Sequence, residues 1–199
     1  MLKIALTGTI ASGKSEAGRL LAARGAHVVD ADHVAHTVYE PGSDGYAPII
    51  QAFGPDILSP DGTIDRRRLA ALVFADANLR KQLTGIVWPL TAQAVDRMAR
   101  EQEAFGTRVF VVEAPLLIEA GWQSYFEQVW LVRARPETVR RRLKSRGLDE
   151  AEIESRLAAA TDTEAAAAAA HLVIDNDGDL AALERAVDEA WRKNVAAGL

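Results

Sequence analysis

Short runs of apolar residues alternate along the chain with longer segments that have a helical pattern. The short runs predict strands, and their continuous apolar character is typical of strands that are covered on both faces, as in a parallel sheet. The predicted strands are residues 4–7, 27–30, 109–114, 129–133 and 172–175.

Capping residues mark where the helices between these strands begin. An aspartate precedes three of the helical segments, and Pro136 suits the first turn of another. The predicted helices are residues 66–74, 136–146, 150–160, the alanine-rich run 165–170, and a last helix that follows Asp179 and ends near Gly198. This alternation predicts an α/β fold with a parallel sheet and right-handed crossovers.

One long stretch, about residues 42–102, has helical patterns but no convincing strand. It interrupts the alternation, and we expect it to form a helical insertion that lies against the sheet. The chain has no linker rich in Pro, Gly or Ser and no internal repeat. We therefore expect residues 1–199 to fold as a single domain.

Residues 8–15 read Gly-Thr-Ile-Ala-Ser-Gly-Lys-Ser and match the phosphate-loop pattern G-x-x-x-x-G-K-[ST] completely. The pattern follows a predicted strand and precedes a helix, as its chemistry requires. Backbone N–H groups and the helix N-terminus bind phosphate oxygens, Lys14 reaches the β- and γ-phosphates, and the Ser15 hydroxyl can bind Mg²⁺. The residues predicted to bind a nucleoside triphosphate are Gly8, Ala11, Ser12, Gly13, Lys14, Ser15 and Glu16.

Carboxylates end two of the predicted strands, at the sheet edge where ligands bind in such folds. Asp30 and Asp32 follow the second strand, and strand alternation places them on the same side of an extended chain. One could hold Mg²⁺ through water and one could accept a proton from an acceptor hydroxyl, while the alternative is a turn-forming and helix-capping pair. Glu113 ends the third strand, either as a second metal-binding residue or as a surface residue.

The segment 133–146 is strongly basic, with Glu137 as its one acidic residue. A basic helix is usually a solvated face or a nucleic-acid patch. In a phosphate-loop protein it is also where a lid would neutralise the transferring phosphoryl group. Arg142 and Arg146 are four positions apart and share one helix face, so we favour a lid over about residues 135–160.

The composition narrows the class of protein further. The 199 residues carry 23 Lys and Arg against 28 Asp and Glu, a net charge of −5, which gives no basic field for nucleic acid. The absence of cysteine excludes disulfides, thiolate metal sites and cysteine nucleophiles. No apolar run is long enough for a membrane span or a signal peptide. We expect a cytoplasmic protein that does not bind membranes, and the sequence leaves its oligomeric state open.

Taken in order along nearly the whole chain, these motifs resemble those of the dephospho-CoA kinase family, whose loop usually reads G-G-I-G-S-G-K-S. The basic helix and several short motifs match as well. The matching segments are residues 8–15, Asp30-Ala31-Asp32, Pro41-Gly42, Asp61-Gly62, Asp65-Arg66, Val73-Phe74, residues 115–119, Arg142 with Arg146, and residues 173–178.

The resemblance implies transfer of the ATP γ-phosphoryl group, with Mg²⁺, to the ribose 3′-hydroxyl of dephospho-CoA. It implies that Asp32 is the base, that Lys14, Arg142 and Arg146 act on the phosphates, and that the insertion binds the CoA precursor. The residues expected to contact that substrate are Asp30, His36, Trp88 and Pro115.

Several positions depart from the family pattern and put the substrate pocket in doubt. Trp88 stands where the family has His before Pro89, and His36 stands where it often has Arg. Ala160 replaces a Gln, and Glu16 replaces a Ser or Thr. We expect Pro89 to open a helix just after Trp88.

Two alternatives stay open at this point. A nucleoside monophosphate kinase or shikimate-type kinase shares the loop and the architecture, because fold does not decide substrate. A non-catalytic ATP-binding protein is the other alternative, although Lys14, Ser15 and Asp32 are all present.

Overall fold

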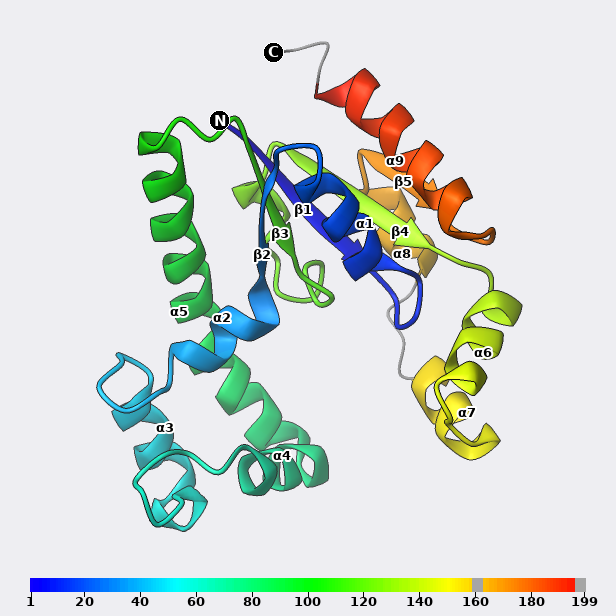
Figure 1. The fold of residues 1–199 in the computed structure, drawn as a ribbon. Coiled ribbons are helices and arrows are strands. Elements are labelled where there is room, and N and C mark those ends of the chain that lie inside the picture. The colour runs from blue at the N-terminus through cyan, green and yellow to red at the C-terminus, as the bar shows by residue number, and fades with distance from the viewer. Residues whose placement is uncertain (159–162, 196–199) are drawn as a thin grey trace. The chain divides into compact units, whose positions relative to one another are not determined.

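The computed structural model describes residues 1–158 and 163–195. Contacts within the chain divide it into two compact units. The first unit contains Met1–Val29 and Gln102–Leu199, and the second contains Asp30–Glu101. Figure 1 shows the helices and strands of both units, and each unit is described by itself below.

The first unit is built on a five-stranded sheet with the strand order β2-β3-β1-β4-β5. Strand β1 pairs in parallel with β3 and with β4, and β4 pairs in parallel with β5. The strands are β1 (Leu2–Gly8), β2 (His27–Asp30), β3 (Val109–Glu113), β4 (Gln128–Arg133) and β5 (Leu172–Asp175). The predicted strands and the α/β class are therefore confirmed.

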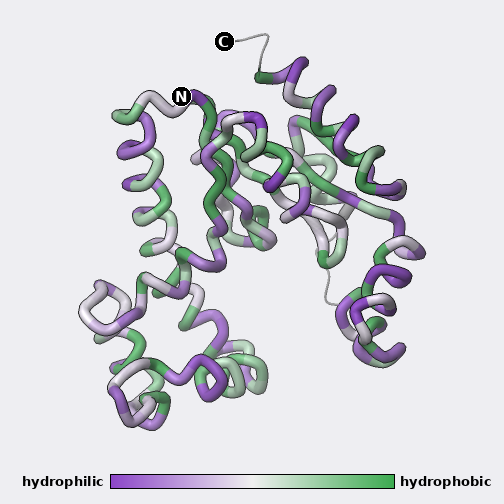
Figure 2. Tube along the Cα trace, in the orientation of Figure 1, coloured by the Kyte–Doolittle hydropathy of each residue, from purple (hydrophilic) through white to green (hydrophobic). Residues whose placement is uncertain are grey.

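Both faces of this sheet are buried, which explains why its strands read as continuous apolar runs. The strands at the centre of the sheet are coloured mainly as hydrophobic in Figure 2. On one face, Ile4, Leu6 and the fully buried Trp130 form a core with side chains of α1 (Lys14–Ala22) and α9 (Leu180–Asn194). On the other face, α8 (Thr163–Ala169) packs against β4 (Figure 1).

Two further helices, α6 (Pro136–Ser145) and α7 (Glu150–Ala158), follow β4 in the first unit. Val139, Leu143 and Ile153 form a small apolar cluster that joins them. A short 3₁₀ helix, Gln123–Tyr125, precedes β4. The predicted ends of two helices at residue 160 and near Gly198, like Ala160 itself, lie outside the described residues. Among the helices of the described ranges, none has the length and hydrophobicity that crossing a bilayer requires.

The second unit is helical. Its elements are α2 (Ala31–Thr37), α3 (Tyr46–Phe53), a 3₁₀ helix (Pro55–Ile57), α4 (Arg66–Ala75) and α5 (Ala77–Ala104), whose last residues belong to the first unit. Leu58 and Ile64 form one antiparallel bridge. The carboxylate of Asp65 accepts N–H bonds from Arg67 and Arg68, so it caps α4 as predicted. That residues 42–102 form a substrate-binding insertion stays a prediction.

The predicted helix start at Pro89 is wrong, because Pro89 lies inside α5. A proline in a helix interior lacks an N–H donor and usually costs about 3 kcal/mol. Here the buried positions of α5 run across it, with Val87 and Thr91 on one stripe that continues to Val95. The exposed side of the helix carries Pro89 itself. Burial along the opposite face therefore keeps the helix continuous.

Candidate active site

The phosphate loop connects β1 to α1 and has the conformation that its glycines allow. Gly13 has φ 98°, in the left-handed region, and caps α1. At Gly8 the backbone approaches β4 so closely that a Cβ would lie 2.5 Å from the carbonyl oxygen of Val132. The N–H of Ser12 donates to the carbonyl of Thr9 at 3.2 Å and closes the turn. Both motif glycines are thus required by geometry.

A hollow of about 540 Å³ opens along the loop. Residues of the loop line it together with Pro115, which follows β3, and Arg146, which ends α6. The hollow contains the side chains of Lys14 and Arg146 and the N-terminus of α1, all of which favour an anion. Its charge and its position at the loop suit the phosphates of a nucleotide.

Lys14 and Glu113 form a buried ion pair, with Nζ 2.8 Å from Oε2 and side chains only 13% and 9% exposed. The interpretation of Glu113 as a surface residue is therefore wrong. Glu113 pairs in register with Leu6, whose side chain belongs to the core between the sheet and α1. Its carboxylate reaches α1 at Gly18, where a Cβ would lie 2.1 Å from Oε1. Whether Glu113 and Ser15 bind a metal stays a prediction.

Asp30 and Asp32 belong to the second unit, and their predicted arrangement on one side of an extended chain is wrong. Asp30 is the N-cap of α2, and its Oδ1 accepts the N–H groups of Asp32 at 2.9 Å and His33 at 3.4 Å. Asp32 lies in the first helical turn with its side chain exposed. The capping interpretation is confirmed for Asp30, and Asp32 remains a solvent-accessible carboxylate at a helix N-terminus.

His36, on the same helix, contacts the ring of Tyr39 edge to face, with centroids 6.0 Å apart. Partial burial lowers the pKa of His36, and the positive charge of Arg66 lowers it further. Burial raises the pKa of Tyr39. Tyr39, Arg66 and Arg67 line a cavity of about 670 Å³ within the second unit, beside Glu40 and Asp65.

Sequence reasoning did not select Tyr39 or Arg66 as binding residues. The signal was present, since Asp65-Arg66 is one of the motifs that carries the family resemblance. Trp88, which was selected, is half-buried in α5 and does not line this cavity.

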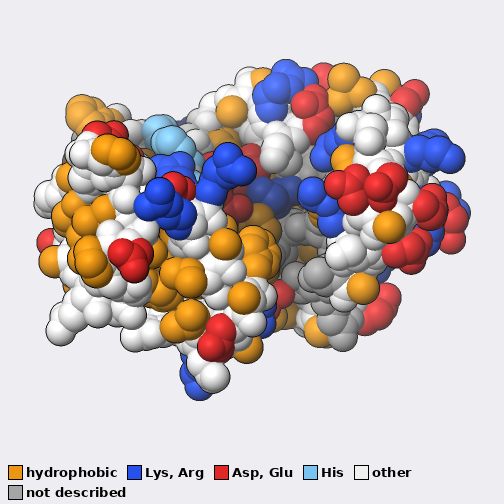
Figure 3. Space-filling model, turned by 90° about the horizontal axis from the view of Figure 1, so that it is seen from below, with side chains coloured by type: hydrophobic (Ala, Val, Ile, Leu, Met, Phe, Trp, Pro, Cys, Tyr) orange, Lys and Arg blue, Asp and Glu red, His pale blue; other side chains and the backbone are white. Residues whose placement is uncertain are grey.

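The basic helix α6 directs its arginines to different partners. Arg140 pairs with Glu154 of α7 at 2.6 Å, and Figure 3 shows acidic side chains lying among basic ones on the face it draws. Arg146 lines the phosphate-loop hollow. Arg142 donates to carbonyl oxygens of the loop, at 3.1 Å from both Ala11 and Ser12. The structure therefore brings Arg142 and Arg146 to the phosphate loop, whereas the guanidinium group of Arg140 pairs with Glu154.

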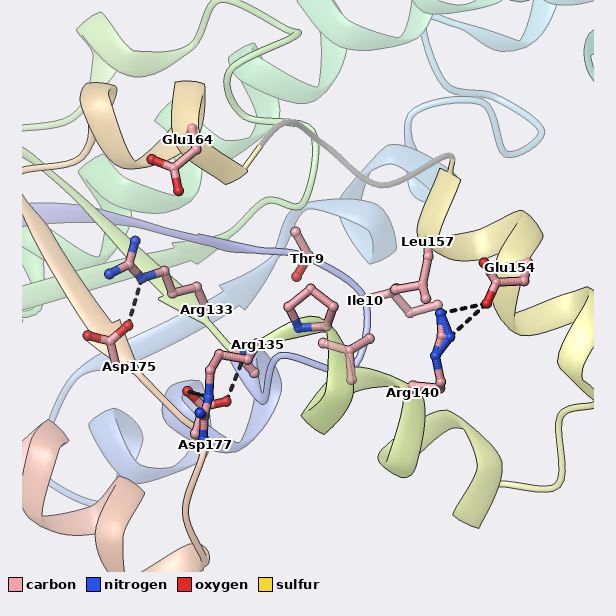
Figure 4. Close-up of a pocket in the computed structure, with 13 residues that line it drawn as sticks. Thr9, Ile10, Arg133, Arg135, Arg140, Glu154, Leu157, Glu164, Asp175 and Asp177 are labelled. Atoms are coloured by element: carbon pink, nitrogen blue, oxygen red, sulfur yellow. Dashed lines mark hydrogen bonds and ion pairs between the residues drawn. The ribbon is translucent and has the colours of Figure 1, made fainter.

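A second hollow, of about 720 Å³, also borders Thr9 and Ile10 (Figure 4). Its arginines are balanced by carboxylates. Arg133 pairs with Asp175 at 2.6 Å, Arg135 pairs with Asp177 at 3.0 Å, and Arg140 pairs with Glu154. The backbone N–H of Arg135 is the main reason that the pKa of Asp177 is lowered. The first hollow, unlike this one, is lined by Gly13, Lys14 and Ser15 at the start of α1, so it suits a phosphate chain better.

Glu16, which stands where the family has Ser or Thr, turns toward Arg19 one helical turn later. Their closest approach is 2.6 Å, and this hydrogen bond lowers the pKa of the Glu16 carboxylate. The carboxylate still borders the phosphate-loop hollow. Its predicted role in nucleotide binding therefore rests on position and stays a prediction. Within the described ranges, no group of three or more His, Asp or Glu side chains could hold a metal ion.

The Lys14–Glu113 pair gives a prediction about Gly18. Replacing a helical glycine by alanine ordinarily stabilises a protein by up to about 1 kcal/mol. In Gly18→Ala the new methyl group meets Glu113, and such overpacking costs about 1–3 kcal/mol. We expect a lower free energy of unfolding in urea. The matched control is Gly85→Ala in α5, where a Cβ meets nothing within 4 Å. Equal stability of the two variants would contradict the tight fit at Glu113.

Comparison with known sequences identifies the family. The sequence model of the family described as dephospho-CoA kinase matches residues 2–182. The dephospho-CoA kinase of Geobacter sulfurreducens is 44% identical over 191 residues, which cover 96% of this chain and 97% of the relative. That of Corynebacterium glutamicum is 40% identical over 198 residues and 99% of both chains.

Solved structures agree in fold. TT1252 from Thermus thermophilus has a TM-score of 0.80 at 32% identity and covers 98% of each chain. Dephospho-CoA kinase from Campylobacter jejuni has a TM-score of 0.73 at 22% identity and covers 99% of this chain and 98% of its own. Shikimate kinase from Acinetobacter baumannii has a TM-score of 0.57 at 16% identity, covers 100% of this chain and 96% of its own, and shares only the fold. With its phosphate loop and with curated relatives matched over almost their full length, the chain belongs to the dephospho-CoA kinase family.

Proposed function

We propose that this protein transfers the γ-phosphoryl group of ATP to the 3′-hydroxyl of the ribose of dephospho-CoA. The products are coenzyme A and ADP. The observation that carries the proposal is the cationic hollow along a complete phosphate loop, in a chain that matches its family over residues 2–182. The matching motifs lie in both units, so the likeness is not confined to nucleotide binding.

The ATP phosphates lie along the loop in this proposal. Lys14 exchanges Glu113 for the β- and γ-phosphates, and Arg146, which also lines the hollow, contributes a second positive charge. Ser15 and Glu113 would hold Mg²⁺, since hydroxyl and carboxylate oxygens are the donors that this ion prefers. When bound there, Mg²⁺ would neutralise charge on the phosphates.

Asp32 accepts the proton of the acceptor hydroxyl. The hydroxyl oxygen forms a bond to the γ-phosphorus, the bond from that phosphorus to the β–γ bridging oxygen breaks, and the bridging oxygen leaves with ADP. The exposure of Asp32 and the rigid helix start that Asp30 fixes support this role. A carboxylate that orients a hydroxyl and accepts its proton contributes about 10²–10⁴-fold to the rate.

The cavity of the second unit supports a place for the rest of the acceptor. Dephospho-CoA carries a pyrophosphate, and arginine guanidinium groups bind phosphate oxygens in a fixed, bidentate geometry. Arg66 and Arg67 supply two such groups at the cavity. Trp88, a partly exposed residue of the same unit, presents its indole there, and we propose that it packs against the acceptor.

The acceptor is tested directly by following ADP release with ATP, Mg²⁺ and a panel of hydroxyl compounds. We expect turnover with dephospho-CoA, and coenzyme A as the product in mass spectra. AMP, shikimate and a reaction without acceptor should give only background. Equal turnover with AMP or shikimate would indicate another kinase, and no turnover with any acceptor would indicate a non-catalytic ATP-binding protein.

Asp32→Asn tests the base. The amide cannot accept the proton, so we expect kcat to fall by about 10²-fold or more, while the affinity for ATP stays nearly unchanged. Asp44→Asn, at another exposed aspartate of the second unit, is the control and should keep normal kcat. Near-normal turnover of Asp32→Asn would exclude Asp32 as the base.

Trp88→Ala tests the acceptor contact. Stacking of an aromatic side chain on a base is worth about 1–3 kcal/mol, so KM for dephospho-CoA should rise by about tenfold or more while KM for ATP changes little. If Trp88 only packs within the second unit, truncation instead lowers stability by about 3–5 kcal/mol and affects both substrates. Thermal melting measured beside the kinetics separates the two. An unchanged acceptor KM with a large drop in Tm would remove Trp88 from the pocket.

A further inference from the structure

The backbone carbonyl groups of a phosphate loop need hydrogen-bond donors that the sequence motif itself does not supply. The N–H groups of the loop must point toward the phosphates, so several of its carbonyl groups point away, into the protein. Buried carbonyl groups need hydrogen-bond donors, because an unpaired one is costly. Two residues outside the motif, Arg142 and Asn176, supply donors to the loop in this protein.

Arg142 contacts the loop and the segment after β5 at the same time. Its Nη1 lies 3.1 Å from the carbonyl oxygens of both Ala11 and Ser12. Its Nη2 lies 2.9 Å from the carbonyl oxygen of Asn176 and 3.4 Å from that of Gly178. The guanidinium group therefore donates to four backbone carbonyls, and its partners lie in two separate segments of the first unit.

Asn176 completes this arrangement from a buried position. Its side chain is 4% exposed, and Nδ2 donates to the carbonyl oxygen of Ser12 at 2.7 Å. Its own backbone N–H donates to the carbonyl of Arg133 at 2.8 Å, which anchors it to the end of β4. A Cβ at Gly13 would lie 2.1 Å from Nδ2, so the loop and the amide fit without spare room.

The loop also carries a strained residue that this arrangement holds in place. Ala11 has φ 56°, the left-handed region in which the Cβ of an L-residue crowds the backbone. Its carbonyl accepts from Arg142, and its methyl group packs against the cluster of Val139, Leu143 and Ile153. Strained conformations persist when surrounding contacts over-determine them. Here those contacts come from α6 and α7.

We infer that Arg142 and Asn176 are positioning residues, which hold the phosphate loop in its phosphate-binding conformation by donating to the carbonyls of Ala11 and Ser12. Sequence reasoning places Arg142 on the nucleotide. In the structure, Nη1 and Nη2 of Arg142 donate to backbone carbonyl groups instead. Asn176 is too deeply buried to be a phosphate ligand. The inference deepens the proposed function at the ATP side and is independent of the acceptor.

Binding of two probes to the full-length protein tests this inference. ATP and inorganic tripolyphosphate are titrated calorimetrically into Arg142→Ala, Asn176→Ala and their double variant. If the two residues position the loop, each single variant weakens both probes by the same factor, about tenfold for the loss of such charged or buried hydrogen bonds. Because both donate to the carbonyl of Ser12, the double variant should lose less than the product of the two single effects.

Arg141→Ala is the matched control, because Arg141 is exposed on the same helix and does not line the hollow along the phosphate loop. It should leave both affinities unchanged. Asn176→Asp keeps the shape of the side chain but replaces the donor by an acceptor, and we expect it to weaken both probes at least as much as Asn176→Ala. Arg142→Lys and Asn176→Asp also serve where an alanine variant does not fold.

Three results would overturn the inference. Weaker ATP binding with unchanged tripolyphosphate binding in Arg142→Ala would place Arg142 on the nucleoside. Fully multiplicative losses in the double variant would mean that Arg142 contacts the phosphates independently of Asn176. A lower Tm with both affinities unchanged would leave the two residues with a role in stability alone. Because neither probe requires dephospho-CoA, failure here is distinguishable from failure of the proposed reaction.

Discussion

The buried pair of Lys14 and Glu113 is the contact on which the rest of the site depends. Two opposite charges removed from water are stable only together, since either one alone would be a buried charge with no partner to offset its desolvation. The pair therefore depends on the register of β3 beside β1, and it leaves no room for a side chain at position 18, which is Gly18. In the proposed function, nucleotide binding is therefore an exchange of partners, in which phosphate oxygens replace the Glu113 carboxylate at the ammonium group of Lys14.

The two units contribute different kinds of chemistry. The first unit is a rigid sheet whose loop residues are fixed by close backbone approaches, as at Gly8, and this suits the placement of a phosphate chain. The second unit is helical. It has an exposed aspartate and a cavity lined by arginines, which suit an acceptor that carries both hydroxyl and phosphate groups. If the second unit binds the acceptor as proposed, differences in substrate choice among relatives would be concentrated in that unit.

The sequence predicts the strands well because strands buried on both faces read as unbroken apolar runs. The helix starts at Asp65 and Asp179 are predicted equally well, because capping is a local interaction. Pro89 misleads, since local propensity favours a helix start and only the buried stripe along α5 overrides it. The partners of Glu113 and Arg142 lie far away in sequence. No local sequence pattern reveals such contacts. The residues of the candidate site could therefore be selected by type, but their positions and hydrogen-bond partners could not be predicted.

Ala11 makes the phosphate loop and the α6–α7 pair interdependent in their sequences. A relative with glycine at this position adopts the same backbone without crowding and has no methyl group to accommodate. In this chain Ala11 packs against the cluster of Val139, Leu143 and Ile153. If α6 and α7 of such a relative replaced those of this chain, the surface that faces Ala11 would have no space for its methyl group. The residue at position 11 and the residues of α6 and α7 that pack against it are therefore expected to change together among relatives.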